Sequence, residues 1–213
     1  MPPRIDAIRL PELDEGIEED LRSRDTVERK RFSRLDIGGE DLSGAAFSEC
    51  SFDDISASES NFRAATFTEV TFTRLNAPIF LAALTRLRDV SIDSSRLGSA
   101  EMYESNFTSV RFSGSKLDFF NASGSGLQDV LFENCTIDEL DLSGAKLQRV
   151  SFVDTTIRTL RLRQTRLTDV DLRGAQFSQI DGFESLSGVT LSSYQVALLS
   201  DSFAAHLGVR VED

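Results

Sequence analysis

The chain has 213 residues, with 35 acidic against 23 basic side chains and a formal net charge of −12. So large an excess of negative charge disfavours binding to nucleic acid or to anionic lipid, so any charged partner should be basic. No window approaches the roughly eighteen apolar residues of a membrane span, and no apolar signal segment follows Met1 to Arg4. These features predict a cytoplasmic protein without direct contact to a membrane or to nucleic acid.

The first segment, residues 1–30, contains nine acidic residues. It also carries more apolar side chains than a purely solvated tail needs, namely Ile5, Ile8, Leu10, Leu13 and Ile17. We therefore expect an N-terminal arm or cap that folds back onto the next part of the chain. An arm there would cover a strand edge that otherwise recruits other chains.

The second segment, residues 31–191, is dominated by a period of five. Every fifth residue from Phe32 to Phe177 is apolar, which gives thirty positions without a slip. In an α-helix five residues overshoot one full turn by about 140°, so the apolar residues would face every direction. In a straight strand successive apolar residues of this period would point to opposite faces. The chain must therefore turn a corner once per repeat, so that each central residue points inward along a coil.

A second period, of twenty residues, gives the number of sides. Positions twenty apart repeat phenylalanine at Phe32, Phe52, Phe72, Phe112, Phe132 and Phe152, so four repeats make one coil. The residue two before each centre is the other inward position and is usually small. Where the central residue is alanine, the residue two positions before it is large, because a close-packed interior needs a constant total volume. The four such pairs are Ile55 with Ala57, Leu75 with Ala77, Phe80 with Ala82 and Phe120 with Ala122.

Three stretches carry the clearest local motif, Asp-Leu-x-Gly-Ala, at residues 41–45, 141–145 and 171–175. With its unbroken period, the chain resembles the pentapeptide-repeat family over about 150 of its 213 residues. The resemblance implies an all-β, right-handed, quadrilateral parallel β-helix. The best-understood relatives are bacterial quinolone-resistance proteins of the Qnr and mycobacterial types, homodimers that bind DNA gyrase or topoisomerase IV as mimics of duplex DNA. The uninterrupted coils make the loopless mycobacterial type the nearer comparison.

The last segment, residues 192–213, predicts a short helix. Ser192 or Ser193 is the expected N-cap, the helix runs from Tyr194 to about His206, and Gly208 ends it. An apolar stripe keeps helical spacing at Val196, Leu199, Phe203 and Leu207. We expect these four residues to serve a homodimer: one face of the helix packs on the last coil, and another, with Leu199 and Phe203, meets a second copy.

Residues for chemistry are scarce. His206 is the single histidine, and no Cys or carboxylate cluster accompanies it at metal-ligand spacing. Cys50 and Cys135 fall on inward positions about four coils apart, too far for a disulfide, and are expected to be free buried thiols. The sequence predicts a non-enzymatic protein without metal, cofactor or small-molecule substrate.

One outward column is mostly acidic. Glu49, Glu69, Asp89, Asp129 and Asp169 recur at twenty-residue spacing, interrupted by Ser109 and Arg149. One interpretation is that these charges keep the rod soluble; the other is an acidic face that a DNA-binding protein such as gyrase accepts in place of DNA. Against the second, residues 146–173 hold seven bases and three acids. The alternative function is a structural or protein-interaction solenoid with an unknown partner.

A second outward group is apolar and consists of Ile79, Leu81, Leu84, Tyr103 and Phe119. A contiguous exposed patch of this kind is uncommon on a soluble monomer unless something covers it. We expect the N-terminal arm to be the cover, with a partner protein as the second possibility. A local break of the coil at Pro78, turning these side chains inward, is the third.

Overall fold

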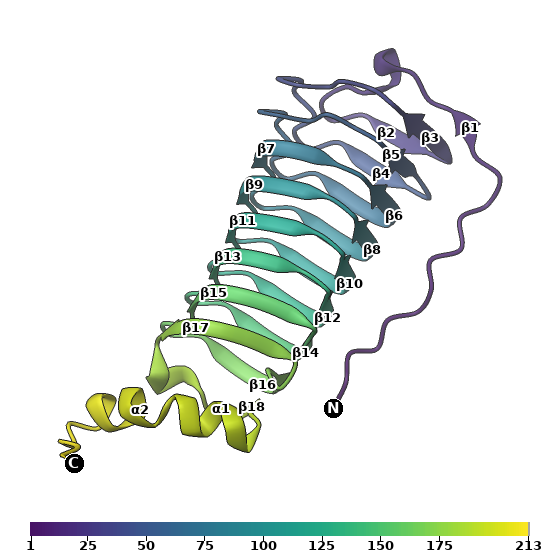
Figure 1. The fold of residues 1–213 in the computed structure, drawn as a ribbon. Helices are drawn as coiled ribbons and strands as arrows, with labels where there is room; N and C mark the ends of the chain where they lie inside the picture. Colours follow the sequence, from purple (N-terminus) through teal and green to yellow (C-terminus); the bar gives the residue numbers. More distant parts are fainter. Residues whose placement is uncertain (213) are drawn as a thin grey trace.

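The protein is a parallel β-solenoid of about 9 turns, shown in Figure 1 as a computed structural model that describes residues 1–212. From residue 26 to residue 181 the ladders join each residue to the one twenty positions later, as Phe112 to Phe132 and Ile137 to Ile157. Four pentapeptides therefore make one coil, and the predicted fold class is confirmed.

The described residues form two sheets. The larger contains β1 (Asp14–Glu15), β2 (Thr26–Glu28), β3 (Lys30–Ser33), β4 (Ala46–Ser48), β5 (Ser51–Asp53), β6 (Thr66–Thr73), β8 (Arg86–Asp93), β10 (Asn106–Ser113), β12 (Gly126–Glu133), β14 (Lys146–Val153), β16 (Arg166–Asp171) and β18 (Val189–Thr190). The smaller contains β7 (Asn76–Leu81), β9 (Arg96–Glu101), β11 (Lys116–Asn121), β13 (Thr136–Asp141), β15 (Thr155–Arg161) and β17 (Ala175–Asp181).

The corners of the coil use left-handed backbone. Positive φ recurs two residues after an inward centre, for example at Glu69 (54°), Arg74 (55°) and Leu84 (61°). The equivalent residues Ile79 and Phe119 lie instead inside the extended strands β7 and β11. Each regular coil therefore has three left-handed corners and one extended corner, and most left-handed positions carry side chains other than glycine despite the cost of that conformation.

The core is a ladder of stacked side chains. Ring centroids lie 4.9 Å apart between Phe32 and Phe52 and 4.8 Å apart between Phe112 and Phe132, with nearly parallel planes. These distances match the spacing of about 4.8 Å between paired strands, so the backbone register holds each ring against the next. Ile92, also buried, interrupts the stack.

Buried hydroxyls form a second ladder at the small inward positions. The Ser95 Oγ accepts a hydrogen bond from the Leu75 backbone N–H at 3.0 Å, and Ser115 does the same for Ser95. Ser105 and Ser125 repeat the arrangement on another side of the coil. The hydroxyl thus satisfies a buried corner N–H of the preceding coil, which explains why serine and threonine are accepted inside the solenoid.

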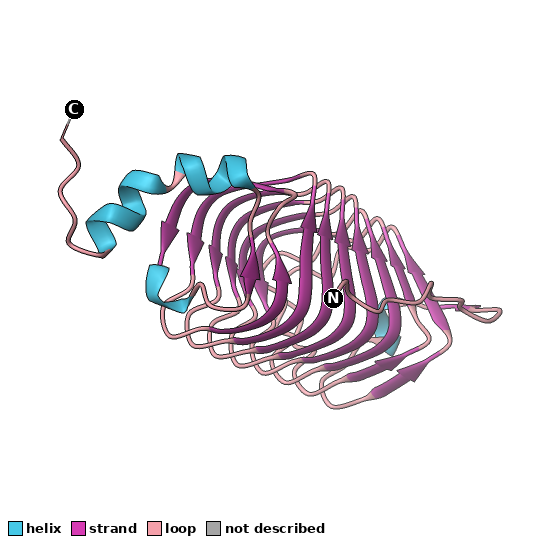
Figure 2. Cartoon of the chain, turned by 90° about the horizontal axis from the view of Figure 1, so that it is seen from below, coloured by secondary structure: helices cyan, strands magenta, loops and turns pink. Residues whose placement is uncertain are grey.

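Helical turns close the C-terminal end (Figure 2). After η2 (Phe183–Ser185), the expected single helix is divided into α1 (Ser193–Leu198) and α2 (Ser200–His206). Ser192 and Gln195 form a capping box, and the Gln195 Nε2 donates to the carbonyl oxygens of Leu172 and Ala175 at 2.7 and 2.8 Å. An amide side chain therefore takes the place of the next coil's backbone donors.

We expect Phe132→Ala to lower the free energy of unfolding by about 3–5 kcal/mol, because it removes a fully buried ring that stacks on Phe112 and Phe152. Urea denaturation measures the change. Thr168→Ala, at an exposed position of the neighbouring side, is the control and should leave the midpoint nearly unchanged. Equal midpoints for the two variants would contradict the stacking argument.

Candidate functional site: the acidic edge and the N-terminal arm

The acidic column forms one continuous edge of the solenoid. Glu49, Glu69, Asp89, Asp129 and Asp169 all have φ between 52° and 56°, so each occupies the same left-handed corner of its coil. The flanking residues are paired in register, as Thr68 with Arg88 and Val70 with Val90. Glu49, Glu69 and Asp89 are therefore one coil apart, about 4.8 Å along the axis, whereas Asp89, Asp129 and Asp169 are two coils apart because Ser109 and Arg149 stand between them. We call this column the acidic edge.

Much of the negative charge on the acidic edge is already compensated. Asp129 forms a two-bond ion pair with Arg149, with Nε–Oδ1 and Nη2–Oδ2 distances of 2.6 and 2.7 Å, and both side chains are at most 10% exposed. Hydrogen bonding from Arg149 lowers the pKa of Asp129. Glu49 pairs with Arg29 at 2.6 Å, and Asp169 lies 3.0 Å from the amino group of Met1. Among residues 1–212, Glu69 has no such partner.

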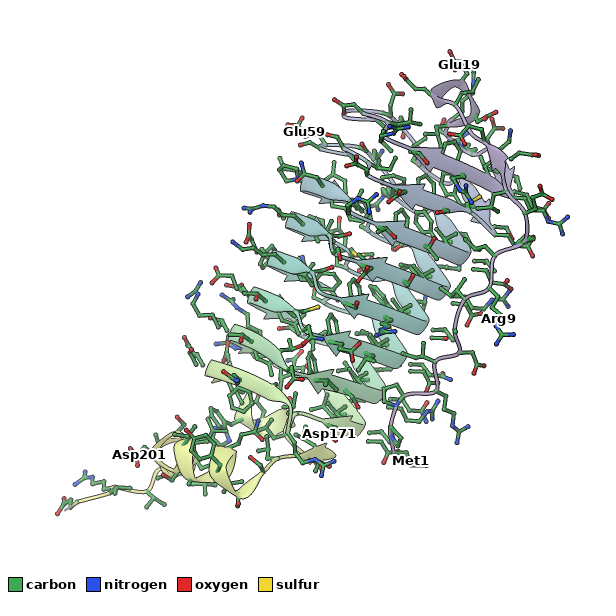
Figure 3. The ribbon with its side chains drawn as sticks, turned by 45° about the vertical axis from the view of Figure 1, so that its right-hand side comes forward. Met1, Arg9, Glu19, Glu59, Asp171 and Asp201 are labelled. Atoms are coloured by element: carbon green, nitrogen blue, oxygen red, sulfur yellow. The ribbon has the colours of Figure 1, made fainter. Side chains whose placement is uncertain are left out.

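Within the predicted N-terminal segment of residues 1–30, residues 1–13 form an arm that runs along this edge (Figure 3). The Arg4 backbone N–H donates to the Asp129 Oδ1 at 2.9 Å, and β1 joins the arm to the first coils through parallel pairing with β3. From Arg29 to Asp169 there are seven coil steps, about 34 Å, which thirteen extended residues of about 3.3 Å each can span. The arm is therefore a strap across most of the coils.

The arm does not cover the apolar patch, so that expectation was wrong. Corners 69 and 79 are two repeats apart in a four-repeat coil, which puts the acidic edge diagonally opposite the column of Ile79 and Phe119. The arm runs along the acidic edge, where the Arg4 backbone N–H donates to the Asp129 carboxylate. Its apolar residues Ile5, Ile8, Leu10 and Leu13 are half-buried on that side.

The apolar patch is exposed in part. Ile79 and Leu81 are each 37% exposed, whereas Leu84, Tyr103 and Phe119 are half-buried. Leu81 and Tyr103 line a cavity of about 460 Å³ together with Asn61, Arg63, Ala83 and Glu101. Pro78 does not break the coil, because the facing Gly98 leaves room where a Cβ would meet the Pro78 carbonyl oxygen at 2.3 Å. The third possibility, a local break of the coil at Pro78, is therefore excluded.

The C-terminal helices present a different surface from the one predicted. Leu199 is 8% exposed, and Phe203 packs edge-on against Phe183 with ring centroids 5.2 Å apart, so both contact their own last coil. The predicted contact of these two residues with a second copy stays a prediction, and in this structure Leu199 is buried against its own chain while Phe203 is half-buried. Val196 and Leu207 are exposed, by 47% and 74%. The helix is interrupted at Leu199, which lies between α1 and α2.

Other sites are not evident within residues 1–212. No group of His, Cys, Asp and Glu in that range has the arrangement needed for a metal ion. None of the described helices is long and apolar enough to cross a membrane. Cys50 and Cys135 are free and buried, and burial raises the pKa of both thiols, which disfavours the reactive thiolate.

Residues 41–74 match the family described as pentapeptide repeats, in eight copies. The chain is a pentapeptide-repeat protein. Among solved structures it is similar to full-length QnrB1, a plasmid-mediated fluoroquinolone resistance protein, at 20% identity and a TM-score of 0.41, covering 89% of this chain and 94% of that one. HetL, involved in heterocyst differentiation regulation in the cyanobacterium Nostoc sp. strain PCC 7120, matches at 14% identity and a TM-score of 0.28, covering 80% and 92%. No curated protein matches the chain.

Asp129→Asn should lower the urea midpoint at pH 7, because it leaves the buried Arg149 without its counter-ion. The pKa of Asp129 is lowered in the folded protein, so its contribution is present above the unfolded pKa of about 3.9 and is lost as pH falls through the folded value. The difference in urea midpoint between the unmodified protein and Asp129→Asn should therefore disappear as the pH falls below about 4.

Asp138→Asn is the matched control, because Asp138 and Arg158 are also twenty residues apart but are 51% and 61% exposed. Its midpoint should stay close to that of the unmodified protein, as exposed pairs contribute little. A larger loss for Asp138→Asn than for Asp129→Asn would contradict the role given to burial.

Proposed function

We propose that this protein is a non-enzymatic, cytoplasmic binding protein whose acidic edge accepts the basic DNA-binding surface of a type II topoisomerase, DNA gyrase or topoisomerase IV. The observation that carries the proposal is the column of carboxylates, one or two coils apart, at the same corner of successive coils. Charge density supports it. Residues 36–141 have 18 acids and 7 bases, and their span of about 25 Å corresponds to about fifteen phosphate charges in duplex DNA.

The arm occupies part of the acidic edge, so a partner can bind the whole edge only after the arm has moved away. It contacts the edge at Asp129 through the Arg4 backbone and at Asp169 through the amino group of Met1. Between those contacts and β1 it has no strand pairing with the coils within the described residues. A basic partner must therefore displace residues 1–13, and their short polar contacts are weaker than a continuous ladder.

A second candidate function is a structural or protein-interaction solenoid that binds its partner elsewhere. The exposed Ile79 and Leu81 beside a cavity of about 460 Å³ favour this alternative, because the arm leaves them uncovered. A homodimer through the C-terminal helices is compatible with both functions. Of the four predicted contacts Val196, Leu199, Phe203 and Leu207, Val196 and Leu207 are exposed and available to a second copy, whereas Leu199 is buried.

The topoisomerase proposal predicts that micromolar protein changes the supercoiling activity of purified DNA gyrase. Reversing Glu49, Glu69 and Asp89 to Lys should weaken the effect at least tenfold, and added salt should weaken it for the unmodified protein through screening. The control reverses Glu104, Asp118 and Asp138, which change the net charge equally at other positions. No effect on gyrase, or equal effects of the two triple variants, would rule out the acidic edge as the contact.

Deleting residues 1–13 should strengthen binding to gyrase several-fold, because it removes an intramolecular competitor from the edge. The same deletion should leave hydrophobic-dye binding at Ile79 and Leu81 unchanged, since the arm lies on the opposite corner. Titration by surface plasmon resonance and dye fluorescence measure the two effects. Weaker binding after the deletion would show that the arm is part of the contact surface instead.

A further inference from the structure

One side of the solenoid has no acidic side chain over six consecutive coils. Its outward residues are the first and third residues of strands β6, β8, β10, β12, β14 and β16. These strands are paired in register. They are Thr66, Thr68, Arg86, Arg88, Asn106, Thr108, Gly126, Gln128, Lys146, Gln148, Arg166 and Thr168. In a chain with 35 acidic residues, a side with four bases and no acid is unusual. We call it the basic face.

Three of its bases also lack a counter-ion. Of the fourteen Lys and Arg residues between positions 35 and 191, ten have a carboxylate within 4.0 Å. The four without one, among residues 1–212, are Arg63, Arg86, Lys146 and Arg166. The basic face therefore holds most of the uncompensated positive charge of the coils, available to an outside anion.

A groove runs along this face. A cavity of about 480 Å³ extends from Asn106 to Arg166, and a second, of about 310 Å³, extends from Thr66 to Asn106. The two share Asn106 and Thr108, so they form one path parallel to the solenoid axis. Polar uncharged side chains line its middle, and the absent side chain of Gly126 widens it there.

We propose that the basic face binds an extended acidic peptide segment of a partner protein. Arg86 and Lys146 lie in one column, three coils or about 14 Å apart, and Arg166 adds one further coil, about 19 Å from Arg86. At about 3.3 Å per residue, an extended peptide places carboxylates four to six residues apart over these bases. The asparagine and glutamine side chains between them both donate and accept, which suits the N–H and C=O groups of a peptide backbone.

A peptide fits this face better than nucleic acid does. Asp89 and Asp169 lie on the corner next to Arg88 and Thr168, where they would repel the dense charge of a phosphate backbone. The face also offers no exposed aromatic ring for base stacking, because Phe107, which lines the groove, is 1% exposed. A few separated carboxylates can pair with the bases without meeting these obstacles.

The test uses the full chain and a fluorescent seven-residue peptide with two glutamates at each end, whose outer carboxylates span about 16–20 Å. Fluorescence anisotropy should show salt-sensitive binding. Arg86→Glu with Lys146→Glu should weaken it at least tenfold, and Arg86→Gln with Lys146→Gln should weaken it less while retaining the unmodified melting temperature. The matched control, Arg63→Glu with Arg96→Glu, makes the same charge change on other sides and should alter affinity less than twofold.

Four results would overturn the proposal. They are the absence of binding at millimolar protein, equal weakening by the control pair, equal affinity for a peptide with its four glutamates in the centre, and tighter binding of a single-stranded oligonucleotide of the same charge. The last result would assign the face to nucleic acid instead. None of these readouts involves gyrase, so the outcome is independent of the function proposed for the acidic edge.

Discussion

The twenty-residue register is the constraint on which the rest of the structure depends. Each coil binds the next through parallel ladders, and the same offset that pairs the backbones stacks Phe112 on Phe132 and Phe132 on Phe152 at 4.8 and 5.0 Å. A slip of one residue would turn the inward set outward along the whole rod. Since backbone pairing and core packing demand the same offset, the solenoid needs no long-range turn signals or disulfides, and its two cysteines remain buried single thiols.

The fold could be predicted because every fifth position is buried and must therefore be apolar, which gives the sequence a visible period of five. The compensated pairs such as Ala122 with Phe120 are buried together, as interior packing requires. The serine ladder appears in the sequence only as a series of small residues. Ser95, Ser105, Ser115 and Ser125 are twenty or ten residues apart, and their hydroxyls each accept a buried backbone N–H. Size and hydrogen bonding favour the same residue types, so a pattern of small residues does not separate them.

The candidate site could be predicted only in part, because its decisive contacts carry no side-chain pattern. The column of Glu49 to Asp169 follows from the register. The strap across it is held by the backbone N–H of Arg4, the amino group of Met1 and the pairing of β1 with β3, none of which depends on the side chains of the strap. Likewise, the break at Leu199 lies inside a stripe with regular helical spacing. The stripe predicted that Leu199 and Phe203 contact a second copy. In the structure both residues pack against the last coil of their own chain.

A solenoid turns each outward position into a continuous strip, and neighbouring strips can carry opposite charge. Asp89 and Arg88 are adjacent in sequence, yet one belongs to the acidic edge and the other to the basic face. Their side chains approach only to 3.9 Å and are 41% and 65% exposed, so solvent screens much of their attraction. Screening lets the two strips act as separate surfaces a few ångströms apart. The net charge of −12 therefore describes neither surface, and arguments about partners belong to individual columns of the coil rather than to the whole chain.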